Sequence, residues 1–229
     1  MSTNIPPTGR EDGAATKLQV LATEHWSLLA TRSLTYTESL SRVTIFLAIV
    51  SGAVIALALV AQADRFGSTF ISIAIPVLFV VLFAGIATVA RLMKLNSDDF
   101  RWVVGMNRLR HAYVDLHPDL ERYFVTSSHD DLPGAFQTFG IEDAASGGGL
   151  GSVFHLIQTL PGMLTVIVAA VAGAIGALAA RAFNVAPTGM ILTAVAAFVL
   201  VLVAMGVWAS RSFGRLPPIL EPRFPTPPG

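Results

Sequence analysis

Four stretches of the chain are built from apolar and small residues and contain no Asp, Glu, Lys or Arg. They cover residues 43–63, 66–90, 144–180 and 182–210. Each is longer than the roughly 18 residues that cross about 30 Å of hydrocarbon as a helix. Their apolar residues are continuous, whereas a transmembrane β-barrel strand alternates between apolar and polar positions. The pattern therefore predicts four transmembrane helices, at residues 43–63, 68–90, 162–180 and 189–209.

The helical pattern continues beyond the first two predicted spans. No glycine or proline lies between Gly13 and Gly52, so a helix that begins near residue 14 can continue into the first span. The second helix can continue to Pro118, which disfavours helical geometry in the residue before it. The predicted helices, 14–62 and 68–116, are equally long and are joined by a short turn. We therefore predict an antiparallel helical hairpin over residues 14–117.

The two arms of this hairpin, residues 14–42 and 91–117, are predicted to extend outside the membrane as a stalk. Their apolar positions alternate at spacings of three and four, which is typical of coiled-coil-like packing. The expected stalk interface consists of Leu18, Leu21, Leu28, Trp102, Met106, Leu109 and Tyr113. Facing positions should add to about 130, so Leu28 is expected near Trp102. One alternative remains open, in which a separate helix capped by Ser97 lies on the membrane surface.

The remaining segments are predicted from turn-forming residues and prolines. Residues 1–13 are expected to be disordered. A short helix can begin at Pro118, and residues 118–149, which include three consecutive glycines, are otherwise expected to be a cytoplasmic linker. Residues 150–210 form the second transmembrane hairpin, and the proline-rich residues 211–229 are expected to be extended and mobile. The fold class is thus an all-α polytopic membrane protein with a helical stalk.

Composition supports lipid as the solvent. Of 229 residues, 53% are hydrophobic and 13% are charged, about half the charged share of an ordinary soluble domain. The formal net charge is zero, so a basic surface for nucleic acid is not indicated. The chain has no cysteine, which excludes disulfides, thiolate chemistry and cysteine zinc sites. The lipid bilayer is therefore the first partner that we expect.

The distribution of basic residues predicts the orientation in the membrane. Thirteen of the fifteen Lys and Arg lie in the N-terminal segment, the central segment and the tail, and only Arg65 and Arg181 lie in the short turns. Basic residues near the ends of spans are retained on the cytoplasmic side. We therefore expect a multi-pass protein of the inner (plasma) membrane with both termini in the cytoplasm.

Candidate chemistry is sparse outside the spans. The stretch "SSHDD" places His129 beside Asp130 and Asp131, which are types that bind metals. A metal site needs three or four converging ligands, and no second cluster lies nearby. The favoured interpretation is a solvated turn. The polar residues that end the second arm are interpreted as polar positions of the stalk end and not as a general acid and base, because no nucleophile with a base and an orienting group accompanies them. They are His111, His117 and Asp119.

The predicted spans themselves contain no Asp, Glu, Lys, Arg or His. Ion-coupled transporters need such groups within the membrane, so their absence argues against that class. A pore lined by small polar residues or by backbone is still possible. The glycines of "GGGLG" at 147–151 lack the lysine of a phosphate-binding loop. We expect no catalytic residue, no metal site and no cofactor.

The third span carries a stripe of small residues. Ala169, Gly173 and Ala177 recur every four positions, and small residues at this spacing let two helices approach closely in lipid. They are predicted to be helix-packing residues. The surface that they contact is either the fourth span of the same chain, which is favoured, or another subunit of a homo-oligomer.

The order of arm, transmembrane hairpin and second arm over residues 14–117 resembles small bacterial four-helix integral membrane proteins. It is also similar to the SLATT class of membrane effectors, which are thought to form pores in nucleotide-triggered defence. Three functional hypotheses follow. The first is a non-enzymatic, oligomeric inner-membrane protein whose cytoplasmic arms bind a protein partner or subunit. The second, which the resemblance implies, is a pore or channel gated by the arms. The third is a membrane-bound enzyme that uses the region of His129.

Overall fold

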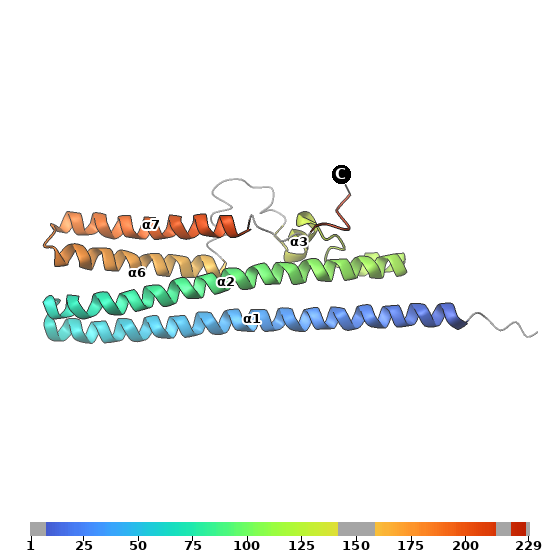
Figure 1. The fold of residues 1–229 in the computed structure, drawn as a ribbon, viewed down its shortest axis with the longest axis horizontal. Helices are drawn as coiled ribbons and strands as arrows, with labels where there is room; N and C mark the ends of the chain where they lie inside the picture. The colour runs from blue at the N-terminus through green and yellow to red at the C-terminus, as the bar shows by residue number, and fades with distance from the viewer. Residues whose placement is uncertain (1–7, 142–158, 214–220, 228–229) are drawn as a thin grey trace, which may run out of the picture. The chain divides into compact units, whose positions relative to one another are not determined.

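The structure is a computed structural model that describes residues 8–141, 159–213 and 221–227. Within these ranges the chain forms helices and no β-strand, so the all-α prediction is confirmed (Figure 1). The elements are α1 (Thr8–Asp64), α2 (Ser68–Leu116), the 3-10 helix η1 (Pro118–Tyr123), α3 (Leu132–Phe139), α6 (Leu160–Ala182) and α7 (Pro187–Phe213).

The chain divides into two compact units, which are described separately. The first unit contains Met1–Tyr36, Asp98–Gly148 and Pro217–Gly229, and the second unit contains Thr37–Ser97 and Gly149–Leu216. Helices α1 and α2 each contribute a segment to both units. The four helices α1, α2, α6 and α7 are long and apolar enough to cross a membrane.

Helix α2 has the predicted bounds and continues without interruption through Asn96 and Ser97. Ser97 therefore does not begin a separate helix. Pro76 lies inside α2, which is tolerated in apolar helices because neighbouring groups satisfy the freed carbonyl. At the other end of the turn, the carboxylate of Asp64 accepts a hydrogen bond from Phe70 N at 2.7 Å and so caps the start of α2.

Two predicted boundaries were wrong, and the predicted third span is part of a slightly longer helix. Helix α1 begins at Thr8, so residues 8–13 are helical rather than disordered, and residues 1–7 lie outside the described part. Helix α6 begins at Leu160 because the Thr159 side chain accepts a hydrogen bond from Gly162 N. Helix α7 extends to Phe213, three residues into the segment assigned to the tail.

The core of the second unit lies where α1, α2, α6 and α7 meet. Its buried cluster consists of Phe46, Val81, Val89, Leu92, Leu95, Leu164, Val168 and Met205. Gly85 permits this packing, because a Cβ at this position would lie 2.6 Å from Val168 Cγ2 and 3.0 Å from Phe46 Cζ. In the most apolar 18-residue stretch of α6, 44% of the residues are buried, whereas in that of α7 the share is 0%. Helix α6 is thus an inner helix and α7 a peripheral one.

Helices α6 and α7 run side by side, and small residues set their separation (Figure 1). A Cβ at Gly173 would lie 3.1 Å from the backbone oxygen of Ala194, and one at Gly176 would lie 2.9 Å from that of Thr193. Ala169 is buried and Ala177 is half-buried. Gly173, from the predicted stripe, therefore faces α7 of the same chain.

An ion-pair group ties α1 to α2 within the second unit. Glu38 accepts hydrogen bonds from Arg91 Nε at 2.9 Å and from Arg42 Nε at 2.8 Å. These two bonds, the one from Arg91 first, lower the pKa of Glu38 to about 2. Glu38 is therefore ionised at any physiological pH.

In the first unit, the arms of α1 and α2 lie against each other. Arg32 Nε donates to Asp99 Oδ1 at 2.7 Å, and the His25 and Tyr113 rings stack with centroids 5.9 Å apart. Burial, followed by the charge of Arg110, lowers the pKa of His25, so its ring is neutral at pH 7. Leu28 was predicted to lie near Trp102. It lies beside Gly105, where an added Cβ would be 3.1 Å from Leu28 Cδ1. That position is one helical turn from Trp102.

The predicted interface residues of the arms differ in burial. Met106 is 4% exposed, and Leu18 is 40% exposed. The others are half-buried: Leu21, Leu28, Trp102, Leu109 and Tyr113. The most buried face of the α2 arm instead packs on α3, through Val103, Val104 and Ala135.

Candidate functional site

Asn107 is the hub that holds the connection after α2 in place. Its side chain is 0% exposed. The amide nitrogen donates to the carbonyls of His129, at 2.7 Å, and Gly134, at 3.2 Å. The amide oxygen accepts from Arg110, at 2.7 Å, and from the Thr138 hydroxyl, at 3.0 Å. Both donors and both acceptor positions of this amide are used, so it anchors the loop and α3 to α2 in one arrangement.

Helix α3 begins and ends at residues suited to those positions. The Asp131 side chain accepts from Gly134 N at 3.0 Å, which is an N-cap. At the other end, Gly140 has a φ of +68°, the left-handed conformation that glycine adopts without steric cost. A Cβ at Gly134 would lie 2.3 Å from the carbonyl oxygen of His129, so only glycine fits there. The sequence therefore fixes how closely α3 approaches the preceding loop.

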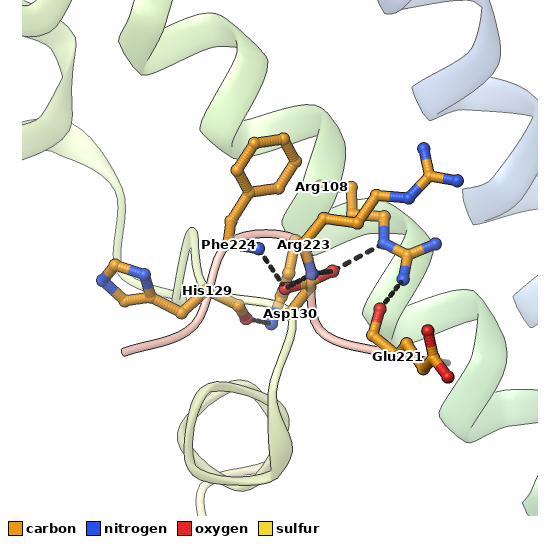
Figure 2. A network of polar contacts seen from close by, with 7 residues as sticks. Arg108, His129, Asp130, Glu221, Arg223 and Phe224 are labelled. Atoms are coloured by element: carbon orange, nitrogen blue, oxygen red, sulfur yellow. Dashed lines mark hydrogen bonds and ion pairs between the residues drawn. The ribbon is translucent and has the colours of Figure 1, made fainter. Parts of the chain in front are cut away.

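Asp130 is buried at the centre of the site, with 1% of its surface exposed. Figure 2 shows its carboxylate between the guanidinium of Arg108 and the backbone of the C-terminal residues. Arg108 Nε donates to it at 2.7 Å. The backbone nitrogens of Arg223 and Phe224 donate to it at 3.0 and 2.8 Å. Asp130 thus joins α2 to a segment more than ninety positions further along the chain.

The C-terminal residues 221–227, which we call the tail segment, are also bound by Asp131. The nitrogen of Thr226 donates to Asp131 Oδ2 at 2.7 Å, and its hydroxyl donates to Oδ1 at 2.9 Å. The pair Asp130 and Asp131 is called the carboxylate clasp below. Arg108 completes the contact, because its second amino group donates to the carbonyl of Glu221 at 2.9 Å.

One aromatic contact anchors the tail segment. The Phe224 ring stacks on the His111 imidazole with centroids 4.0 Å apart and an angle of 23° between the planes. In addition, Asp130 N donates to the Phe224 carbonyl at 3.2 Å. Phe224 is half-buried, and the other residues of the tail segment are exposed. The segment is therefore held mainly by hydrogen bonds and by one ring.

The clasp carboxylates are ionised in this arrangement. Burial by itself would raise the pKa of Asp130, but the hydrogen bonds from Arg223 N, Arg108 and Phe224 N outweigh it and lower the pKa below the ordinary value. For Asp131, burial likewise acts upward, and the hydrogen bonds from Thr226 and Gly134 lower the pKa overall. A carboxylate that is kept charged and accepts several N–H groups acts as an anchor for backbone.

A small pocket of about 200 Å³ lies beside the clasp. Residues that line it include Glu121, Phe124, Ser127, His129 and Gln137. The His129 Nδ1 atom is buried and has no hydrogen-bond partner among the described residues. Within those same residues, no group of three His, Asp or Glu is arranged to hold a metal ion.

Three interpretations of this region were wrong. The stretch 127–131 is not a solvated turn, because Ser127 and Asp130 are 5% and 1% exposed. The short helix predicted to begin at Pro118 is formed as η1, whereas α3 was not predicted, and residues 142–158 lie outside the described part. Residues 221–227 are bound rather than free, although residues 214–220 and 228–229 are not described. His111, interpreted as a polar position of the stalk end, is half-buried against Phe224, and His117 and Asp119 are exposed.

A second, larger pocket lies within the second unit. It has a volume of about 910 Å³, is open, and is bordered by the α1–α2 and α6–α7 turns. Arg181 bridges these turns by donating to the Phe66 carbonyl at 3.2 Å. The lining contains Arg181, serines, an asparagine and apolar side chains, but no carboxylate or histidine. The lining therefore contains no acid–base pair.

The α1 arm carries large side chains that are left uncovered. Trp26 is 71% exposed, Leu34 70%, Tyr36 64% and Val20 63%. Aromatic and aliphatic side chains exposed along one helix are typical of a surface that binds another protein.

Comparison with known proteins adds no identity to these observations. No protein-family model, no curated protein and no solved structure matches the chain.

Proposed function

We propose that the chain is a non-enzymatic, multi-pass membrane protein whose first unit lies in the cytoplasm and binds a protein subunit through the α1 arm. The observation that carries this proposal is the exposure of Trp26, Leu34 and Tyr36 on that arm. Tryptophan and tyrosine supply much of the binding energy of protein interfaces when a partner covers them. A second copy of the chain is the first partner to test, because a homo-oligomer needs no further component.

The structural features near the candidate chemistry support a binding role over an enzymatic one. Asp130 and Asp131 are saturated by hydrogen bonds that hold the chain itself. The large pocket of the second unit has no carboxylate or histidine in its lining. A general acid or base must be able to exchange a proton with a substrate, and a carboxylate held by three donors is poorly suited to do so.

The oligomer test uses substitutions on the exposed arm. Trp26→Ser with Leu34→Ser should reduce the mass of the detergent-solubilised protein, measured by native mass spectrometry. Val125→Ser is the matched control, because Val125 is 94% exposed in the first unit but lies outside α1. A mass that does not change in the double variant, from an oligomeric starting protein, would refute a role of this surface in assembly. A monomeric starting protein would refute the second copy as partner.

The same preparation tests the pore alternative and the orientation. Single-channel recording in planar bilayers should detect no conductance if the protein is only a binding module. For orientation, the chain has no native cysteine, so single cysteines can be labelled from either side. Val125→Cys should react only from the cytoplasm, and Phe183→Cys, 83% exposed in the α6–α7 turn, only from outside. The reverse pattern would overturn the orientation.

A further inference from the structure

We propose that the carboxylate clasp is a binding site for an extended, proline-containing peptide of a partner protein. In the free protein, residues 221–227 of the chain's own tail occupy this site, and the partner peptide displaces them. This site is distinct from the exposed surface of the α1 arm. The proposal is carried by how the clasp uses the backbone of its occupant.

Every backbone N–H of residues 222–227 is donated to the clasp. Proline has no N–H, and positions 222, 225 and 227 are prolines. The three remaining nitrogens, of Arg223, Phe224 and Thr226, all donate to Asp130 or Asp131. The spacing of two carboxylates therefore matches a segment in which prolines alternate with one or two residues that can donate. This match defines the class of peptide as Pro-x-Phe-Pro-x-Pro, where x is a residue with an N–H.

The side chains of the occupant add only one strong requirement. Arg223 and the three prolines are exposed. The clasp therefore selects these residues only through the backbone conformation that they adopt. Prolines restrict the unbound chain and so reduce the entropy lost when an extended segment binds. Phe224 is the exception, because its ring stacks on His111. A peptide from another protein needs an aromatic residue at this position and can vary elsewhere.

The tail segment is suited to be exchanged. Only one of its side chains is half-buried, so little apolar surface opposes its release. The loop that carries Asp130 and Asp131 is held in place without the tail segment. Asn107 donates to the carbonyls of His129 and Gly134, and Asp131 also caps α3. The two carboxylates of the clasp therefore keep their positions when the tail segment is released. The covalent tail has a high effective concentration, so it blocks weak ligands and selects for tight ones.

The test uses a fluorescent synthetic peptide with the sequence of residues 221–227, EPRFPTP, and full-length protein in detergent. The variant Phe224→Ala/Thr226→Pro weakens the chain's own tail by removing the ring and one donor. Fluorescence anisotropy should show that this variant binds the peptide at least about tenfold more tightly than the native chain. Adding Asp130→Asn to the variant should lower its affinity by about tenfold or more.

Peptide variants distinguish backbone recognition from simple charge attraction. N-methylation at the Phe224 position removes the donor and keeps the side chain, so binding should fall about tenfold. Arg223→Ala in the peptide is the control and should change affinity less than about twofold, because the Arg223 side chain is exposed. Equal loss of affinity from Arg223→Ala would overturn the proposal in favour of charge attraction. Absence of binding to the weakened-tail variant would also overturn it.

A second measurement does not depend on any protein variant. In the native chain, excess unlabelled peptide should increase hydrogen exchange at the protein's own Phe224 and Thr226 amides, because these lose the clasp as acceptor. A peptide of the same composition in scrambled order should have no effect. If neither peptide changes the exchange at concentrations that saturate the variant, the tail is a permanent part of the fold and the proposal fails.

Discussion

Arg108 and Asp130 form an ion pair with an Nε–Oδ2 distance of 2.7 Å, and the Asp130 side chain in this pair is 0% exposed. A carboxylate that is removed from water in this way is stable as a charge only while its partner is present. Arg108, 22% exposed, keeps part of its side chain at the surface and also reaches the Glu221 carbonyl. One arginine therefore stabilises both the buried carboxylate and the segment that it binds.

Replacing Arg108 should be costly for this reason. Arg108→Ala leaves the Asp130 charge uncompensated, and we expect the free energy of unfolding to fall by about 3 kcal/mol. Arg101→Ala is the matched control on the same helix, because Arg101 pairs with Asp98 at 3.4 Å within one helical turn. It should cost no more than about 0.5 kcal/mol. Hydrogen exchange of residues 221–227 and thermal unfolding in detergent measure both effects, and equal losses would contradict the assignment.

The docking of the tail segment should depend on pH in the acid range. The pKa of Asp130 is lowered from an ordinary value of 3.8 in the folded protein. The carboxylate therefore stabilises docking above that ordinary value, and this contribution is lost as pH falls through the lowered folded value. The protection of the Arg223 amide against hydrogen exchange should be kept from neutral pH to about 5 and be lost only below pH 3.8. A transition near pH 6 would show that another group controls docking.

The sequence predicts the helices more completely than the site. Charge-free runs predict the four helices that are long and apolar enough to cross a membrane, because lipid excludes ionised side chains wherever they occur along a helix. The end of α2 before Pro118 is set by a local steric effect and was predicted to the residue. By contrast, Asp130 meets residues 223 and 224, which are 93 and 94 positions away. No local pattern encodes that contact, and the prolines alone favoured an extended tail.

Register in the arms shows a second limit. The predicted pairing used backbone positions alone, and Arg32–Asp99 falls within one position of it. Side chains on a helix point toward its N-terminus, so in an antiparallel pair each reaches past its own position in opposite directions. This explains why Leu28 lies on Gly105 and why His25 meets Tyr113, which is further along α2 than the simple rule gives. A signal at Asn107 was available, since a polar residue that follows the buried Val103, Val104 and Met106 on the same helix needs a partner.

The stability of the first unit should depend on the side-chain nitrogen of Asn107. Asn107→Asp replaces the amide donor by an oxygen that faces the carbonyls of His129 and Gly134. Both carbonyls lose their donor, and we expect the free energy of unfolding of the first unit to fall by at least about 2 kcal/mol. Gln19→Glu, at an exposed amide in the part of α1 that belongs to the first unit, is the control and should change it by no more than about 0.5 kcal/mol. Chemical denaturation followed by the fluorescence of Trp102 measures the difference, and a neutral Asn107→Asp would refute the hub.

The last prediction concerns the close contact of α6 with α7. Lipid gives little hydrophobic drive for helices to associate, so backbone approach and dispersion supply much of the attraction. Gly173→Leu would place a bulky side chain where a single Cβ already lies 3.1 Å from the Ala194 oxygen, so we expect destabilisation of about 1–3 kcal/mol. Gly206→Leu on α7 is the control, because a Cβ there meets no atom within 4 Å.

Thermal unfolding and oligomer mass, both in detergent, together identify the surface that the small-residue stripe contacts. Loss of stability in Gly173→Leu, with Gly206→Leu unchanged, is expected from the contact with Ala194. If Gly173→Leu instead lowers the oligomer mass while the monomer keeps its unfolding temperature, the stripe packs between subunits. If neither quantity changes, α6 and α7 can separate without cost, and close backbone contact does not hold this hairpin together.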